Sequence, residues 1–216
     1  MSEPATLALR EQFATPEQQR QTASIGMWLF LASEVMMFGA LFTAYTVYRI
    51  SHPQGFQAGS ADMDVLLGSI NTAILLTSSL MLAFAEHSAQ AGRRGWLAFF
   101  LIATMVIGLV FLGIKFTEYY DHYHEHKAPG FWFNDTSPYA TSVEMFFVFY
   151  FIMTGLHSIH MIIGEIFLGI LVFRTFLGSF SARYHTPVLF GGLYWHFVDI
   201  VWIFLYAIFY LPGLHK

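Results

Sequence analysis

Residues 189–211 read LFGGLYWHFVDIVWIFLYAIFYL, a run that is long enough and apolar enough to cross a lipid bilayer. The run nevertheless contains His196 and Asp199, which are three residues apart and therefore lie on one face of a helix. Ionisable side chains inside a membrane are costly, so they are rarely kept there without a use. The segment predicts a membrane helix that carries a polar feature inside the bilayer.

The composition of the whole chain is typical of a membrane protein. Of its 216 residues, 56% are hydrophobic, 19% aromatic and 11% charged, and the mean hydropathy is +0.55. Soluble domains carry about 25% charged residues, so this chain has too few charges to cover a water-facing surface. Its net charge of −4 gives no reason to expect a nucleic-acid partner. The lack of cysteine excludes disulfides, cysteine-bound zinc and iron–sulfur clusters.

Five apolar runs predict an all-α fold, a polytopic membrane protein with a bundle of five transmembrane helices. The runs lie at about 24–48, 65–87, 95–117, 141–173 and 189–211, and they form one membrane domain over residues 24–212. The fourth run is long enough to extend past the bilayer or to tilt. Residues 1–23 lack the basic and apolar regions of a signal peptide, and we expect them to form a polar arm.

Positive charges near the helix ends predict how the chain crosses the membrane. The side that contains the N-terminus carries six of them, namely Arg10, Arg20, Arg93, Arg94, Arg174 and Arg183. The other side carries four, namely Arg49, Lys115, Lys127 and Lys216. This excess predicts a cytoplasmic N-terminus and a periplasmic C-terminus.

A group of ionisable side chains is expected at a similar depth in the inner half of the membrane. At about 1.5 Å of rise per residue, Glu34, Glu165 and Asp199 lie about 13–15 Å from the inner face. Charged groups in lipid pair with one another or face a wet cavity, so we expect a buried, proton-related polar cluster. Its members are Glu34, Glu86, His87, Glu165, His196 and Asp199, with His157 and His160 close to the same level.

Several of the histidines have the spacing of metal ligands. His157 and His160 are one helical turn apart, and Glu165 follows them. A di-iron carboxylate bundle would need two Glu-x-x-His pairs, and the predicted helices contain none. The HYHEH segment, residues 122–126, could hold a stray divalent cation, but we expect no metal site. The histidines are expected to bond carboxylates or a partner subunit.

Two further residues allow two interpretations each. Glu34 lies in the middle of an apolar helix, where it is either a carboxylic acid kept neutral by burial or a group that exchanges protons or contacts lipid. Arg174 ends the fourth span, where it either extends to the interface or holds the phosphate of an anionic lipid.

Five stretches, in order, resemble a known family. They are WLFLASEVMMFGALFTAY (28–45), LLTSSLMLAFAEHS (75–88), KFTEYY (115–120), TGLHSIHMIIGEIFLGILVFR (154–174) and YWHFVDIVWIFLY (194–206). Together they resemble subunit III of haem–copper oxidases. Glu34 matches the buried glutamate of that family, and Glu86 occupies the first histidine position of its Ala-His-His motif.

The resemblance implies a short, five-helix bacterial form that lacks the first two helices of the seven-helix form. In the long form these two helices build one wall of a lipid-filled cleft. The resemblance places His157, His160 and Arg174 near bound phospholipid. It implies no redox cofactor in this chain, with haem and copper in partner subunits, and a multi-pass place in the bacterial inner membrane.

The resemblance also implies a role. Such a chain packs on oxidase subunit I, beside subunit II, and supports proton uptake, turnover stability and oxygen access while O2 is reduced to water. The motif forms favour cytochrome c oxidase over a quinol oxidase or a nitric oxide reductase-associated protein. A free-standing di-metal membrane oxygenase is the alternative from another class. A small transporter with Glu34 and Asp199 as a proton relay ranks last, because no repeat or broken helix is visible.

Overall fold

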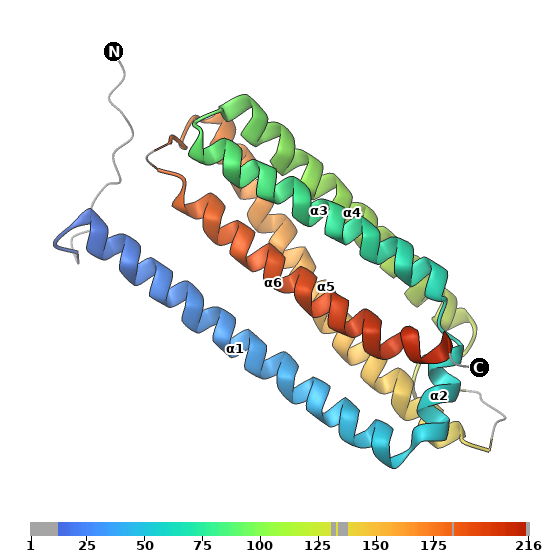
Figure 1. Ribbon diagram of the computed structural model, residues 1–216. Coiled ribbons are helices and arrows are strands. Elements are labelled where there is room, and N and C mark those ends of the chain that lie inside the picture. Colours follow the sequence, from blue (N-terminus) through green and yellow to red (C-terminus); the bar gives the residue numbers. More distant parts are fainter. Residues whose placement is uncertain (1–12, 131–132, 134–137, 183, 215–216) are drawn as a thin grey trace.

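In the part of the chain that the structure describes, five long helices and one short helix account for most residues (Figure 1). The computed structural model describes residues 13–130, 133, 138–182 and 184–214. The helices are α1 (Pro16–Ser51), α2 (Pro53–Ala61), α3 (Val65–Gln90), α4 (Arg94–His124), α5 (Ala140–Phe176) and α6 (Thr186–Phe209), followed by a 3-10 turn (Leu211–Leu214). The five long helices are apolar enough to span a membrane, which confirms the predicted all-α bundle.

The helices extend beyond the apolar runs that predict them. Proline is favoured in the first turn of a helix, and α1 begins at Pro16, where the Thr15 side chain accepts a hydrogen bond from Gln18 N. Residues 16–23 of the predicted polar arm therefore form the first turns of α1, and its residues 1–12 lie outside the described part of the chain. Pro53 likewise starts α2 in the polar sequence between the first two apolar runs. Hydropathy marks only where the lipid contact ends, whereas the helix continues into the headgroup layer.

Helix length explains this difference. α1 has 36 residues and α5 has 37, so each is about 54–56 Å long. The hydrocarbon core of a bilayer is only about 30 Å thick. Both helices must therefore tilt or carry polar turns outside the lipid, as expected for the fourth span.

Helices α3 to α6 pack closely on one another, whereas α1 makes fewer contacts with the rest of the bundle. α3 and α4 lie side by side, α5 and α6 lie beneath them, and α1 runs along the opposite side of α6 (Figure 1). Aromatic pairs line the contact between α1 and α6, including Phe38 with Phe197 and Phe42 with Phe204. The outer face of α1 is open, since Met36 is 76% exposed and Leu29 67%. That face must meet lipid or another protein.

Candidate functional site

The structure pairs Glu34 of α1 with His160 of α5. Glu34 Oε2 lies 3.0 Å from His160 Nε2. The other ring nitrogen, Nδ1, donates to the carbonyl oxygen of Leu156 at 2.8 Å, because a carbonyl can only accept. Nε2 is therefore left to share one proton with the carboxyl group. Both side chains are largely buried, and the edge of Phe38 packs on the imidazole. This pair can hold or pass a proton inside the membrane domain.

A second polar group lies between α3 and α6. Ser79 Oγ is 2.7 Å from His196 Nδ1, and His196 Nε2 is 4.0 Å from Glu86 Oε1. The carboxyl of Glu86 lies directly over Gly192, where any larger residue would overlap it. Asp199 is buried close to Ser79, but neither of its oxygens has a hydrogen-bond partner in the described part of the chain.

Glu165 and His157 of α5 are buried in apolar surroundings. The carboxyl of Glu165 faces Gly108 of α4, and His157 lies between the rings of Phe111 and Trp202. Among the residues that the structure describes, neither side chain has a hydrogen-bond partner. The predicted set is therefore divided: Glu34 meets His160, His196 meets Glu86, and Glu165 and His157 stand by themselves.

The remaining predicted residues lie near the helix ends. His87 is exposed in the last turn of α3, and the Arg174 guanidinium lies 5.6 Å from the centre of the Phe180 ring. Arg174 is 14 residues after His160 on α5, or about 21 Å along the helix. One phosphate group cannot contact both residues.

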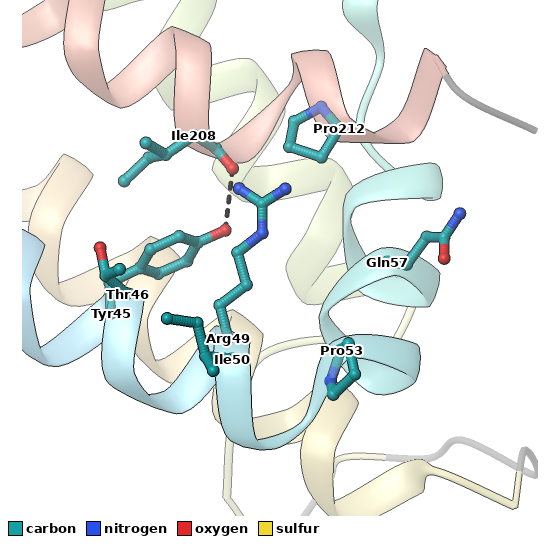
Figure 2. Close-up of a pocket in the computed structure, with 8 residues that line it drawn as sticks. All are labelled: Tyr45, Thr46, Arg49, Ile50, Pro53, Gln57, Ile208 and Pro212. Atoms are coloured by element: carbon teal, nitrogen blue, oxygen red, sulfur yellow. Dashed lines mark hydrogen bonds between the residues drawn. The ribbon is translucent and has the colours of Figure 1, made fainter.

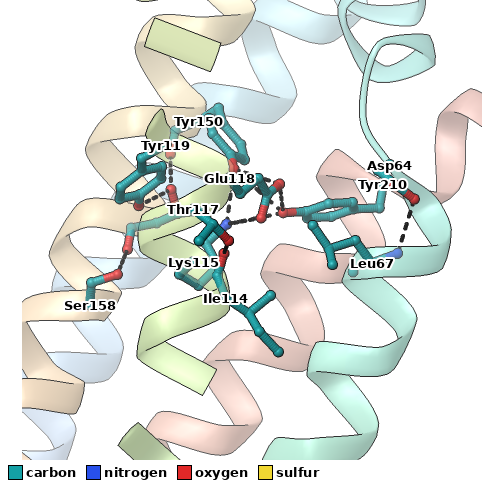
Figure 3. A network of polar contacts seen from close by, with 12 residues as sticks. Asp64, Leu67, Ile114, Lys115, Thr117, Glu118, Tyr119, Tyr150, Ser158 and Tyr210 are labelled. Carbon is teal, nitrogen blue, oxygen red and sulfur yellow. Dashed lines mark hydrogen bonds and ion pairs between the residues drawn. The ribbon is translucent and has the colours of Figure 1, made fainter. Parts of the chain in front are cut away.

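A buried polar network that is not among the predicted sites joins α4, α5 and the end of α6 (Figure 3). Lys115 Nζ lies 2.9 Å from Glu118 Oε2, and it also donates to the hydroxyls of Tyr150 and Tyr210 at 2.9 and 3.0 Å. Both hydroxyls donate to Glu118 Oε1. Lys115 is only 1% exposed, so counting it as an interfacial charge is wrong. The sequence pattern that indicates this buried pair is a Lys and a Glu one turn apart in an apolar helix, because that spacing brings the two side chains together.

The histidine-rich segment 122–126, at the end of α4, does not assemble a metal-ligand set among the described residues. The His122 ring is buried against Phe147 and Tyr150. Across the described residues, no three His, Asp or Glu side chains are grouped closely enough to hold a metal ion. Just outside the membrane-spanning helices, Lys127 Nζ lies 2.9 Å from Glu125 and 3.5 Å from Asp62. The hydrogen bond from Lys127 holds the pKa of the Glu125 carboxyl below its ordinary value.

Taken together, five long apolar helices with acid–imidazole pairs between them define a polytopic membrane protein with buried proton-binding groups. Residues 14–214 match the model of the family described as cytochrome c oxidase subunit III. The chain belongs to this family, which confirms the resemblance seen in its motifs. As a subunit III it forms part of a complex with other oxidase subunits.

Curated relatives align with this chain over most of its length. Cytochrome c oxidase subunit 3 of Arabidopsis thaliana is 33% identical over 196 residues, covering 87% of this chain and 68% of that protein. The protein of the same name from Thermostichus vulcanus is 32% identical over 192 residues, covering 87% of this chain and 86% of that protein. The human protein is 31% identical over 198 residues, covering 87% and 69%.

Proposed function

We propose that this chain is the non-redox subunit III of a bacterial cytochrome c oxidase, packed on subunit I beside subunit II in the inner membrane. The observation that carries the proposal is the family match, which runs through all five long helices. Haem and copper belong to the partner subunits in this proposal. The curated relatives described above are all named for cytochrome c oxidase, which favours cytochrome c over quinol as the electron donor.

The proposed orientation places the N-terminus in the cytoplasm and the C-terminus in the periplasm. With Lys115 removed from the count, the described part of the chain has Arg20, Arg93, Arg94 and Arg174 at the N-terminal end of the bundle. Arg49 and Lys127 are at the other end. Short cytoplasmic segments carry the excess of positive charge, so the revised count supports the same orientation.

The Glu34–His160 pair supports a role in proton uptake and in turnover stability. Its carboxyl and imidazole share a hydrogen bond of 3.0 Å within the membrane domain. An acid and an imidazole in contact can take up one proton and release it again with little rearrangement. On the proposed orientation the pair buffers protons for the uptake path of the neighbouring catalytic subunit.

An apolar cavity next to this pair supports lipid binding and oxygen access. The cavity has a volume of about 330 Å³ and is lined by Met27, Phe30, Ile163, Phe167, Phe190 and Tyr194. The Tyr194 hydroxyl donates to the carbonyl of His160 at 2.9 Å. Such a space suits an acyl chain or dissolved O2. We propose that phospholipid lies here against His160, with Arg174 at a separate headgroup position, and that it covers the exposed face of α1.

Replacing Glu34 tests the proton role. In the purified oxidase, Glu34→Ala and His160→Ala are expected to lower proton uptake or to shorten the working life of the enzyme during turnover, while the haem spectrum stays unchanged. Glu17→Gln, an exposed acid in the first turn of the same helix, is the matched control. An oxidase unaltered in both respects would reduce Glu34 to a packing residue.

The identity of the complex is tested separately. Purification in mild detergent should bring down haem-bearing partners, and the complex should oxidise reduced cytochrome c. A chain that purifies alone would contradict the subunit assignment. Near-stoichiometric iron in the isolated chain would instead support the di-metal oxygenase, and oxidation of quinol alone would support the quinol enzyme.

A further inference from the structure

An arginine lines a cavity at the opposite end of the bundle from the proposed cytoplasmic face (Figure 2). The cavity has a volume of about 540 Å³ and lies where α1, α2 and the end of α6 meet. Its walls include Tyr45, Thr46 and Arg49 of α1, Gln57 of α2, and Ile208 and Pro212. The space is within the size range of small-ligand sites, and most of its wall is apolar.

The charge of Arg49 is not matched by any acid in the described part of the chain. None of the ion pairs among these residues includes Arg49. Lys127, a second cation described at this end, is already held by Asp62 and Glu125. The Arg49 guanidinium lies beside the Tyr45 hydroxyl, which itself donates to the carbonyl of Ile208 at 2.8 Å (Figure 2). The N–H donors of the Arg49 guanidinium are thus held at the cavity beside a neutral hydroxyl, with no carboxylate among the described residues to pair with the charge.

The position of Arg49 along α1 corresponds to the headgroup layer of a bilayer. Glu34 is near the midpoint of α1, and Arg49 is 15 residues further on, or about 22 Å along the helix. The bilayer with its headgroups is about 40–45 Å thick, so its phosphates lie about 20 Å from the middle. Below the cavity, the exposed ring of Phe204 and the adjacent Phe42 offer an apolar surface toward the membrane centre.

We propose that this cavity binds the phosphate of an anionic membrane phospholipid, with Arg49 as the phosphate ligand and the α1–α6 surface as the seat of its acyl chain. Guanidinium groups match phosphate oxygens with two parallel hydrogen bonds. The apolar walls of Tyr45, Ile208 and Pro212 favour a lipid over a free anion. This site is about 22 Å along α1 from the Glu34–His160 pair, and it does not depend on which oxidase the chain belongs to.

Native mass spectrometry of the purified full chain with phosphatidylglycerol tests the proposal. Arg49→Gln should lower the number of retained phosphatidylglycerol molecules by one and weaken that binding about tenfold or more, since hydrogen bonds to charged groups are worth about 1.5–3 kcal/mol. Arg93→Gln removes the same charge from an exposed position at the other end of the bundle and should change nothing.

A second variant distinguishes the effect of the Arg49 charge from the effect of the cavity volume. Thr46→Phe fills the cavity from an exposed position and leaves Arg49 in place, so it should also lose the lipid. Circular dichroism confirms that the variants keep their helix content. The proposal is overturned if Arg49→Gln retains phosphatidylglycerol like the unmodified chain. It is also overturned if inorganic phosphate alone binds with the same dependence on Arg49, because the site would then be one for a free anion.

Discussion

Removing one charge of the Lys115–Glu118 pair should destabilise the chain more than any surface substitution. In Glu118→Gln, an amide nitrogen can take the place of Oε2, which lies 2.9 Å from Lys115 Nζ, so that one donor faces another. The ammonium group is only 1% exposed and would keep only the two tyrosine oxygens. Breaking a buried ion pair costs about 3–5 kcal/mol, so we expect a loss of this size in the free energy of unfolding.

Removing both charges should restore most of the stability. In the double variant Lys115→Met/Glu118→Gln, the amide oxygen can still accept from Tyr150 and Tyr210, and no uncompensated ammonium remains. Apolar replacements of buried pairs are often neutral, so this variant should unfold within about 1 kcal/mol of the unmodified chain. The coupling between the two sites should then exceed about 2 kcal/mol.

Denaturant titration of the full chain in detergent measures these differences. Tryptophan fluorescence is a suitable signal, because Lys115 Nζ lies 5.1 Å from the centre of the Trp202 ring. Lys127→Met is the control: it breaks a partly exposed pair and should cost about 0–1 kcal/mol. A Glu118→Gln loss no greater than that of the control would refute the reasoning, as would a double variant whose loss equals the sum of the two single losses.

Two further predictions concern packing and pH. Gly164→Ala should lower the free energy of unfolding by about 1–3 kcal/mol, because a methyl group there would lie 2.9 Å from the Trp195 ring. Gly155→Ala on the same helix meets nothing within 4 Å and should raise the free energy of unfolding by about 0.5–1 kcal/mol. Equal losses for the two variants in the same denaturant titration would contradict this prediction. Lys127 lowers the pKa of Glu125 from its ordinary value of 4.5, so the contribution of this pair is present above that pH and lost as the pH falls through the lowered pKa. Lys127→Met should remove that acid-side dependence, and a thermal-unfolding series between about pH 3 and 6 will show whether it does.

The sequence predicts the membrane helices well because lipid imposes a simple condition. Each crossing needs about 20 apolar residues, and the five long helices all contain such a run. Their ends are harder to predict, since Pro16 and Pro53 start helices in polar sequence where hydropathy gives no signal. The short helix α2 is missed for the same reason.

The polar groups are harder to place than the helices. Depth along a helix follows from counting residues, and it puts Glu34 and His160 at similar levels. Which faces meet depends on helix rotation and tilt, which packing decides. This is why Glu34 finds His160 while Glu165 faces Gly108. Lys115 shows the opposite case, because a charge near a helix end in sequence can still be buried when its acid partner is one turn away.

The docking of α1 against α6 has a consequence for how the chain is made. The hydrogen bond from Tyr45 to Ile208 spans 163 residues, and the Glu34–His160 contact spans 126. At a synthesis rate of about 5–20 residues per second, α1 waits roughly 8–30 s before the surface that it packs on exists. α1 therefore enters the membrane before α6, on which it packs, has been synthesised. During that delay the Glu34 carboxyl has to be accommodated by the bilayer or by an insertion chaperone, because its partner His160 has not yet been translated.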